Sequence, residues 1–224
     1  MTISEEQAPR VAIIGGSGKV AKYLISQLHA RGDEVVAIFR NPDRFDELAE
    51  LGAIPVVLDI EKASVSELAS ALAGCDAVVF SAGAGGGDPA RTRAVDFDGA
   101  VATVNAATLA HVPRFVIVSA IGVGRDLPGD PGDSMRPYYE AKRDADLVVE
   151  ASNLEYTIVR PGGLTDDAAT GLVTVGDSVD TGSIAREDVA AFIVAALYDP
   201  RTIGHAWELV AGQNSITDAI DAAL

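Results

Sequence analysis

The sequence of 224 residues predicts an α/β fold in which helices cover both faces of a doubly wound parallel sheet. Two observations carry this prediction. Short apolar runs rich in valine and isoleucine alternate with helical patterns along most of the chain, and they lack the polar alternation of a half-exposed strand. A glycine-rich turn also stands directly between the first run and the first helical pattern. We therefore expect right-handed crossovers between neighbouring parallel strands.

Six apolar runs are predicted to form the strands of this sheet. They are 10–14, 34–39, 54–58, 76–80, 114–119 and 156–160. The helical patterns lie between them, at 19–31, 44–52, 64–74, 90–112 and 136–146. In the first, Val20, Leu24 and Leu28 recur at a spacing of four and define one buried face.

The last third of the chain is less regular. It is expected to contain strands at 172–175 and 205–210 and a helix at 186–199. We predict one domain over residues 1–224, with 163–183 and 200–224 forming a small substrate-side region. The segments 122–137 and 163–183 are expected to determine the substrate.

Composition excludes several classes of function. The net charge of −16 repels phosphate, so nucleic acids and anionic membranes are not expected as partners. Cys75 is the single cysteine, which excludes an internal disulfide and a cysteine-based metal cluster. The three histidines are scattered without metal-ligand spacing, so no metal is expected. Neither a leader peptide nor a membrane-spanning run is recognisable, which favours a cytoplasmic monomer or homodimer acting on a small molecule.

The glycine turn indicates a dinucleotide site. Gly15, Gly18 and Ala21 form a G-x-x-G-x-x-A pattern that ends the first strand and opens the first helix. Residues without a side chain allow a diphosphate to approach the backbone N–H groups at the positive end of the helix. Ser17, Lys19 and Val20 are expected beside the phosphates; the alternative is a turn that only joins a strand to a helix.

The end of the second strand favours NADP(H) over NAD(H). An NAD site commonly has a carboxylate there, whereas this chain has Arg40, which can bind a 2′-phosphate. The alternative is a solvated strand-end charge. Two further strand ends should face the same crevice, with Asp59 and Ile60 at the adenine. Small residues at the next strand end, Ser81, Ala82 and Gly83, leave room for the nucleotide.

Taken together, these segments resemble the atypical short-chain dehydrogenases/reductases. The segments on which this resemblance rests are "IIGGSGKVA", "AIFRNP", "LDI", "SAGAG", "YYEAK" and "IVRPGGL". The resemblance is strongest to small NAD(P)-binding bacterial proteins of the epimerase/dehydratase-like or NmrA-like kind. It implies a Rossmann fold, a bound NAD(P)(H) and a substrate pocket built by the C-terminal third. It does not specify the reaction.

The stretch "RPYYEAKRDAD" supplies the candidate catalytic pair. Tyr138 and Lys142 are four residues apart and share one helix face. A lysine beside a phenol lowers its pKa and can also bind the cofactor ribose, while the tyrosine exchanges a proton as hydride moves. The alternative is a tyrosine that packs in the core.

Three further features bear on the predicted catalytic and cofactor site. Catalytic members of the family carry a further Ser or Thr after the fifth strand; here Ser119 is present but Ala120 follows it, which leaves catalysis open. Asp96 replaces an asparagine-containing turn of extended relatives, and we expect for it no role beyond helix structure. Pro161 and Gly162 should bring backbone against the nicotinamide.

The favoured function is an NADP(H)-dependent oxidoreductase that transfers hydride to a small carbonyl, quinone or flavin-like substrate. A non-catalytic NAD(P)H-binding redox sensor is the first alternative. An NAD-dependent sugar epimerase or dehydratase is the second.

Overall fold

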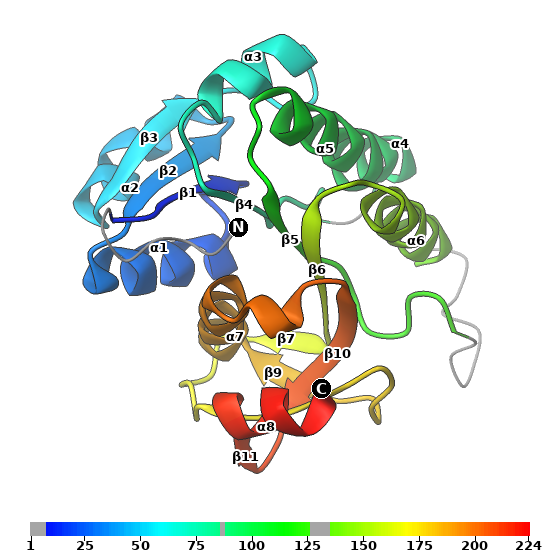
Figure 1. Cartoon of the computed structure of the whole chain (residues 1–224). Helices are drawn as coiled ribbons and strands as arrows, with labels where there is room; N and C mark the ends of the chain where they lie inside the picture. Colours follow the sequence, from blue (N-terminus) through cyan, green and yellow to red (C-terminus); the bar gives the residue numbers. More distant parts are fainter. Residues whose placement is uncertain (1–7, 86–87, 126–134) are drawn as a thin grey trace.

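A computed structural model describes residues 8–85, 88–125 and 135–224. The predicted α/β fold is confirmed, with helices packed around a mostly parallel sheet (Figure 1). Within the described residues this sheet has nine strands. In spatial order they are β11 (Asn214–Ser215), β8 (Leu172–Gly176), β10 (His205–Ala211), β6 (Glu155–Pro161), β5 (Arg114–Val118), β4 (Ala77–Phe80), β1 (Arg10–Ile14), β2 (Glu34–Phe39) and β3 (Ala53–Val57).

From β1 the chain builds the sheet outwards first to one side, through β2 and β3, and then to the other, through β4, β5 and β6. This change of side places a crevice at the carboxyl ends of β1 and β4. The run β3-β2-β1-β4-β5-β6-β10 is parallel throughout, whereas β8 pairs antiparallel with β10 and β11 antiparallel with β8. The order 3-2-1-4-5-6 is that of a Rossmann sheet, in which ligands bind at the switch point of the strand order.

Helices lie on both faces of the sheet (Figure 1). α1 (Lys19–Arg31), α2 (Phe45–Glu50), α7 (Arg186–Tyr198) and α8 (Ile216–Ala223) contribute to one buried apolar cluster. α3 (Val65–Ala71), α5 (Gly99–Leu109) and α6 (Arg136–Glu150) contribute to the other. Successive residues of a strand belong to opposite clusters, as Val11 and Ile13 do against Ala12 and Ile14. The strands read as unbroken apolar runs because both of their faces are covered.

The helical stretch predicted at 90–112 is three segments in the structure. α4 (Pro89–Thr92) leads into a π-helical turn (Arg93–Asp98), and α5 follows at Gly99. Short 3-10 turns also occur at Pro42–Arg44 and Pro200–Thr202. A second, small parallel sheet pairs β7 (Gly163–Thr165) with β9 (Ser183–Ala185). None of the helices in the described ranges has the length and apolar character to cross a membrane.

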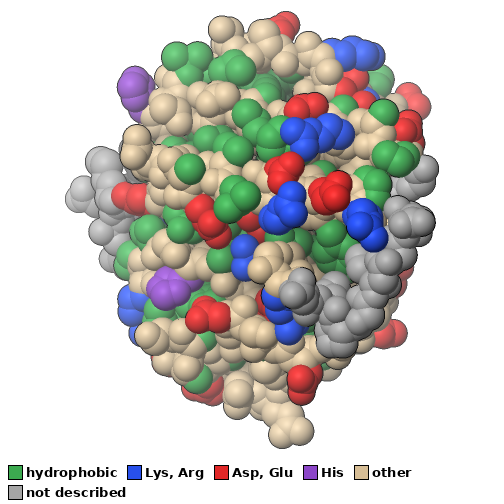
Figure 2. Space-filling model, turned by 90° about the vertical axis from the view of Figure 1, so that its right-hand side faces the viewer, with side chains coloured by type: hydrophobic (Ala, Val, Ile, Leu, Met, Phe, Trp, Pro, Cys, Tyr) green, Lys and Arg blue, Asp and Glu red, His purple; other side chains and the backbone are tan. Residues whose placement is uncertain are grey.

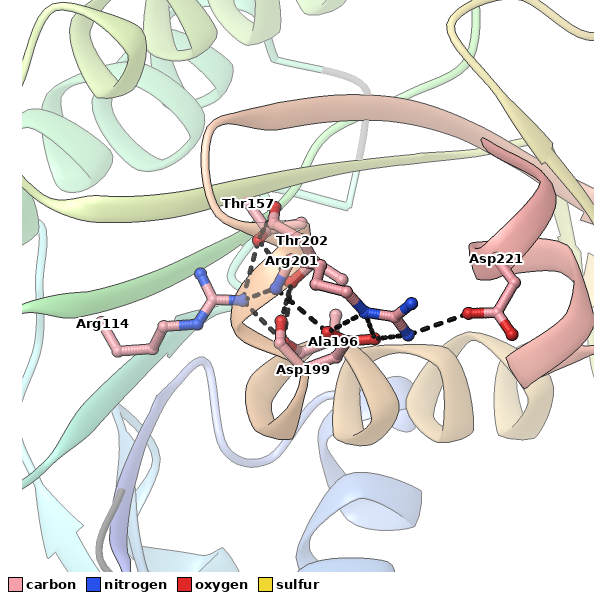
Figure 3. Close-up of polar contacts among 7 residues, drawn as sticks. All are labelled: Arg114, Thr157, Ala196, Asp199, Arg201, Thr202 and Asp221. Carbon is pink, nitrogen blue, oxygen red and sulfur yellow. Dashed lines mark hydrogen bonds and ion pairs between the residues drawn. The ribbon is translucent and has the colours of Figure 1, made fainter. Parts of the chain in front are cut away.

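A buried arginine ties the C-terminal third to the sheet (Figure 3). The guanidinium of Arg114, at the start of β5, donates to the hydroxyls of Thr157 and Thr202 and to the backbone carbonyl of Ala196 near the end of α7. A cation is stabilised at a helix C-terminus. Burial lowers the pKa of Arg114 to about 10, so it stays charged at neutral pH. Arg201 in turn links Asp199 to Asp221 on α8.

Candidate functional site

The glycine turn between β1 and α1 packs closely against the chain after β4 and leaves the start of α1 without a side-chain cap. Gly15 has φ +82°, and its N–H and that of Gly16 donate to the carbonyl of Ile38. A Cβ at Gly15 would lie 2.7 Å from the Cα of Ala82, so a larger residue does not fit. Gly18 precedes α1 and no side chain caps the helix. The first N–H groups of α1 therefore remain available to an anion.

A first cavity of about 260 Å³ opens beside this turn at the ends of β2 and β3. Arg40, Asp59 and Ile60 line it, together with Gly15, Ser17, Gly18, Ser81, Ala82 and Gly83. The Asp59 carboxylate accepts the N–H of Glu61 at 3.2 Å. It also pairs with Lys62 at 3.3 Å. Its predicted contact with adenine stays a prediction.

Sequence reasoning missed two charged residues in this first cavity. Arg40 pairs with Glu61 at 2.6 Å, and the Nε atom of Arg91 lies 3.5 Å from the same carboxylate. Arg91 also donates to the carbonyl of Ala84. The cavity thus holds two guanidinium groups around one carboxylate. Arg91 is 51 positions from Arg40 in the chain, and no local pattern signals that they meet.

A second cavity of about 740 Å³ continues from the first towards α6. The two share Gly18, Ser81, Ala82 and Gly83 in their walls. Lys19, Val20, Val118, Ser119, Tyr138 and Lys142 line the second, and so do Leu164 and Arg186 from the C-terminal third. The structure therefore gathers most of the predicted site along one crevice. Residues 126–134 of the predicted substrate-determining segment lie outside the described part of the chain.

The Tyr138–Lys142 pair lies in the wall of this second cavity. The Nζ atom of Lys142 is 5.9 Å from the centre of the Tyr138 ring, and it donates to the carbonyl of Val118 at 3.0 Å. Burial raises the pKa of Tyr138; the charge of Lys142 acts in the opposite direction, whereas that of Asp96 adds to the rise. In this state the phenol is protonated at neutral pH.

Asp96 has a larger role than sequence analysis expected. It lies in the π-helical turn, and its Oδ1 atom is 3.0 Å from the Nζ atom of Lys142. Its Oδ2 atom accepts the N–H of Ala84 at 2.9 Å. The expectation that Asp96 serves only helix structure does not describe this arrangement, because its carboxylate reaches both α6 and the loop after β4.

Ser119 engages a different partner from the one its predicted role requires. Its hydroxyl donates to Asp146 at 2.9 Å, and Arg160 pairs with the same carboxylate oxygen at 2.9 Å. Burial raises the pKa of Asp146 to about 6, with Arg160 opposing the rise. Ser119 lines the cavity, but its proton points to α6. Its predicted catalytic role stays a prediction.

Pro161 and Gly162 are absent from the described walls of both cavities. Gly162 donates to the carbonyl of Leu209 at 2.9 Å, and a Cβ there would lie 2.3 Å from the carbonyl oxygen of Gly182. Gly162 thus has a packing role in this structure. Contact of these two residues with a nicotinamide stays a prediction.

An ion-pair bridge crosses the side of the second cavity. Asp166, just after β7, pairs with Lys19 at 2.5 Å and with Arg186 at 2.6 Å. This Lys19–Asp166–Arg186 bridge connects the start of α1 to the small sheet. The described residues include no group of three or more His, Cys, Asp or Glu side chains placed to hold a metal ion.

A Rossmann sheet with a glycine turn at its switch point and no side-chain cap on the first helix defines a dinucleotide-binding protein. Comparison with known families agrees, because the NAD(P)H-binding family model matches residues 15–200. The chain belongs to this NAD(P)H-binding family.

Similar proteins match nearly the whole length of the chain. UPF0659 protein YMR090W of Saccharomyces cerevisiae is 42% identical over 223 residues, which cover 95% of this chain and 98% of the relative. A solved structure from Bacillus halodurans, provisionally named an NAD-dependent epimerase/dehydratase, is 38% identical with a TM-score of 0.88, covering 96% and 100%. The anaerobillin reductase ChuY of Escherichia coli O157:H7 is 25% identical with a TM-score of 0.76, covering 90% and 97%.

Proposed function

We propose that the protein is an NADP(H)-dependent oxidoreductase that transfers hydride to a small carbonyl, quinone or flavin-like substrate. The observation that carries the proposal is the position of Tyr138 and Lys142 in the wall of a cavity of about 740 Å³ that begins at the glycine turn. When bound, NADPH supplies the hydride, and the reaction consumes one proton for each acceptor reduced.

The chain's own residues have separable tasks in this reaction. The N–H groups at the start of α1, which no side chain caps, bind the diphosphate, and Gly15 and Gly18 line the cavity beside them. Lys142 keeps donor capacity beyond its contacts with Val118 and Asp96, because an ammonium has three N–H groups, and this capacity suits a ribose hydroxyl. Tyr138 donates the proton to the reduced oxygen of the substrate.

Turnover of Tyr138→Phe tests this function. Steady-state oxidation of NADPH is measured with a panel of quinones, flavins and aldehydes. General acid catalysis contributes roughly 10²–10⁴-fold, so the rate constant kcat should fall by about that factor while the Kd for NADPH stays unchanged. Tyr139→Phe is the matched control and should retain turnover, because its ring lies beside Tyr138 but is absent from the described wall of the cavity. Full activity of Tyr138→Phe would remove the phenol from the mechanism.

Arg40 supports the preference for NADP(H). A hydrogen bond to a charged group contributes about 1.5–3 kcal/mol, so Arg40→Ala should weaken NADPH binding by roughly 10-fold to 100-fold. The affinity for NADH, which lacks the 2′-phosphate, should change little in this variant. Glu61→Gln is the counterpart: it releases Arg40 and Arg91 from their carboxylate and should strengthen NADPH binding. Fluorescence titration with NADPH and with NADH measures both affinities. If Arg40→Ala weakened the binding of the two cofactors equally, Arg40 would not be the ligand of the 2′-phosphate.

One observation favours a non-catalytic NAD(P)H-binding sensor as a second candidate. The hydroxyl of Ser119 is committed to Asp146 instead of the cavity. NADPH binding without turnover on any acceptor would support the sensor.

The name of the Bacillus halodurans structure supports a third candidate, an NAD-dependent epimerase or dehydratase. Such an enzyme regenerates its cofactor in each cycle and holds it tightly. Copurified NAD⁺ that resists dialysis would favour this candidate over the first two.

A further inference from the structure

Asp96 and Lys142 form a buried ion pair in the wall of the second cavity. Their side chains are 1% and 4% exposed, and the charged atoms are 3.0 Å apart. Buried charges are stable only when they are paired, so neither group can be moved without consequence for the other.

The carboxylate of Asp96 is fixed at both oxygen atoms. Oδ1 faces Lys142, and Oδ2 accepts the N–H of Ala84, whose carbonyl accepts a bond from Arg91. The backbone around Asp96 is a π-helical turn, an arrangement that often occurs at functional sites. Asp96 therefore has a defined position between the loop after β4 and α6.

The pair acts on the phenol of Tyr138. A lysine alone would favour the phenolate, but a carboxylate 3.0 Å from the ammonium offsets its charge. Burial of Tyr138 then dominates and raises its pKa, with Lys142 lowering it and Asp96 raising it. The other ionisable groups acting on the phenol are Tyr139 and Asp146, and the further charged residues in the cavity wall are Lys19, Asp88 and Arg186.

We propose that Asp96 is a positioning residue that holds Lys142 and offsets its charge, so that Tyr138 remains a neutral phenol and the site is set to donate a proton. The site would then favour reduction of its substrate over oxidation of an alcohol. This functional consequence rests on the proposed oxidoreductase activity, whereas the ionisation of Tyr138 does not.

The titration of Tyr138 tests the proposal without any substrate. The chain is produced with 3-fluorotyrosine, whose more acidic phenol titrates within the range where proteins stay folded. ¹⁹F NMR follows the five tyrosines against pH, and Tyr138→Phe assigns the signal. Asp96→Asn preserves an oxygen that can accept the Ala84 N–H but removes the charge. An increase in the acidity of Tyr138 of threefold or more supports the proposal, and a smaller change or a decrease overturns it.

Asp98→Asn is the matched control. It lies in the same π-helical turn and its side chain is 63% exposed, so the acidity of Tyr138 should stay the same. An equal shift in this control would overturn the specific role of Asp96, because loss of any nearby negative charge would then suffice.

Asp96→Asn leaves Lys142 unpaired and can prevent folding, so a second variant keeps the test decisive. Asp96→Asn combined with Lys142→Gln removes both charges. If the two charges offset each other at Tyr138, the double variant should titrate within threefold of the wild-type protein. A decrease in acidity of threefold or more would show that Lys142 acts on the phenol without compensation, and would overturn the proposal.

Activity separates this proposal from the proposed function. With 1,2-naphthoquinone and NADPH, the alkaline limit of turnover should move to lower pH in Asp96→Asn, in step with the NMR titration. Absence of turnover in the wild-type protein with every quinone, flavin and aldehyde of the panel would reject the oxidoreductase function but leave the titration result standing. Turnover whose pH limit does not follow the titration would overturn the proposed link between Asp96 and proton donation.

Discussion

Asp146 shows how a single buried residue determines part of the pH dependence of stability. Its carboxylate is held by Ser119 and Arg160, yet burial raises its pKa from the ordinary 3.8 to about 6. A carboxyl group with a raised pKa binds a proton more readily in the folded than in the unfolded chain. Its contribution to stability is therefore complete below pH 3.8 and is lost as the pH rises through about 6.

Asp146→Asn measures this contribution. As the pH falls from 6 towards 4, the free energy of unfolding of the wild-type protein should increase relative to that of the variant, by up to about 3 kcal/mol. Urea unfolding at several pH values gives the difference. Asp144→Asn on the same helix is the control with opposite sign, because a hydrogen bond from Arg143 lowers the pKa of Asp144. A pH-independent difference for Asp146→Asn would show that its ionisation is unchanged by folding.

At the scale of elements, Gly162 illustrates a residue whose role depends on its neighbours. It follows β6, where a Cβ would lie 2.9 Å from Val210 and 2.3 Å from the carbonyl oxygen of Gly182. Forcing extra atoms into a packed site costs roughly 1–3 kcal/mol. Gly162→Ala should therefore lower the free energy of unfolding by about that amount.

The adjacent Gly163→Ala is its control. Its nearest contacts would be 3.8 Å away, an ordinary separation, so stability should change little. Equal losses in the two variants would mean that a general glycine effect, not contact with Gly182, is responsible. Denaturant unfolding of both proteins decides this.

The elements themselves were largely predictable. The helix expected at 19–31 is present at those bounds, and the runs 10–14 and 34–39 are strands, because burial on both faces of a parallel sheet demands continuous apolar residues. The π-helical turn was not predictable, since "RAVDFD" continues the helical pattern around it. The pairing of Asp96 with Lys142 and of Arg40 with Glu61 depends on tertiary contacts, which no local spacing encodes. The glycine turn was recognisable because its chemistry is local.

At the scale of the whole molecule, the net charge of −16 opposes the compact state. On the face that Figure 2 shows, positive and negative side chains are interspersed. In the described chain, ion pairs such as Arg93–Asp144 bring opposite charges together. Exposed pairs contribute about 0–1 kcal/mol each, so they do not cancel the overall repulsion. Single-domain organisation over residues 1–224 and a cytoplasmic location stay predictions.

Salt should therefore stabilise the protein. Raising sodium chloride shortens the screening length from about 30 Å at 0.01 M to about 8 Å at 0.15 M, which weakens long-range repulsion more than short ion pairs. We expect the Tm to rise over this range, measured by calorimetry. Chloride is preferred to sulfate because sulfate stabilises proteins by a different route, exclusion from their surface. A Tm that falls would show that surface ion pairs outweigh net charge.

The Lys19–Asp166–Arg186 bridge has a consequence for how firmly the start of α1 and the small sheet are held together. Asp166 is 59% exposed, so solvent screens both of its contacts, and each of them is weak. Weak exposed ion pairs of this kind break and re-form by thermal motion. The first helix and the small sheet are thus joined here by contacts that open spontaneously, and separating them at this point needs no separate trigger.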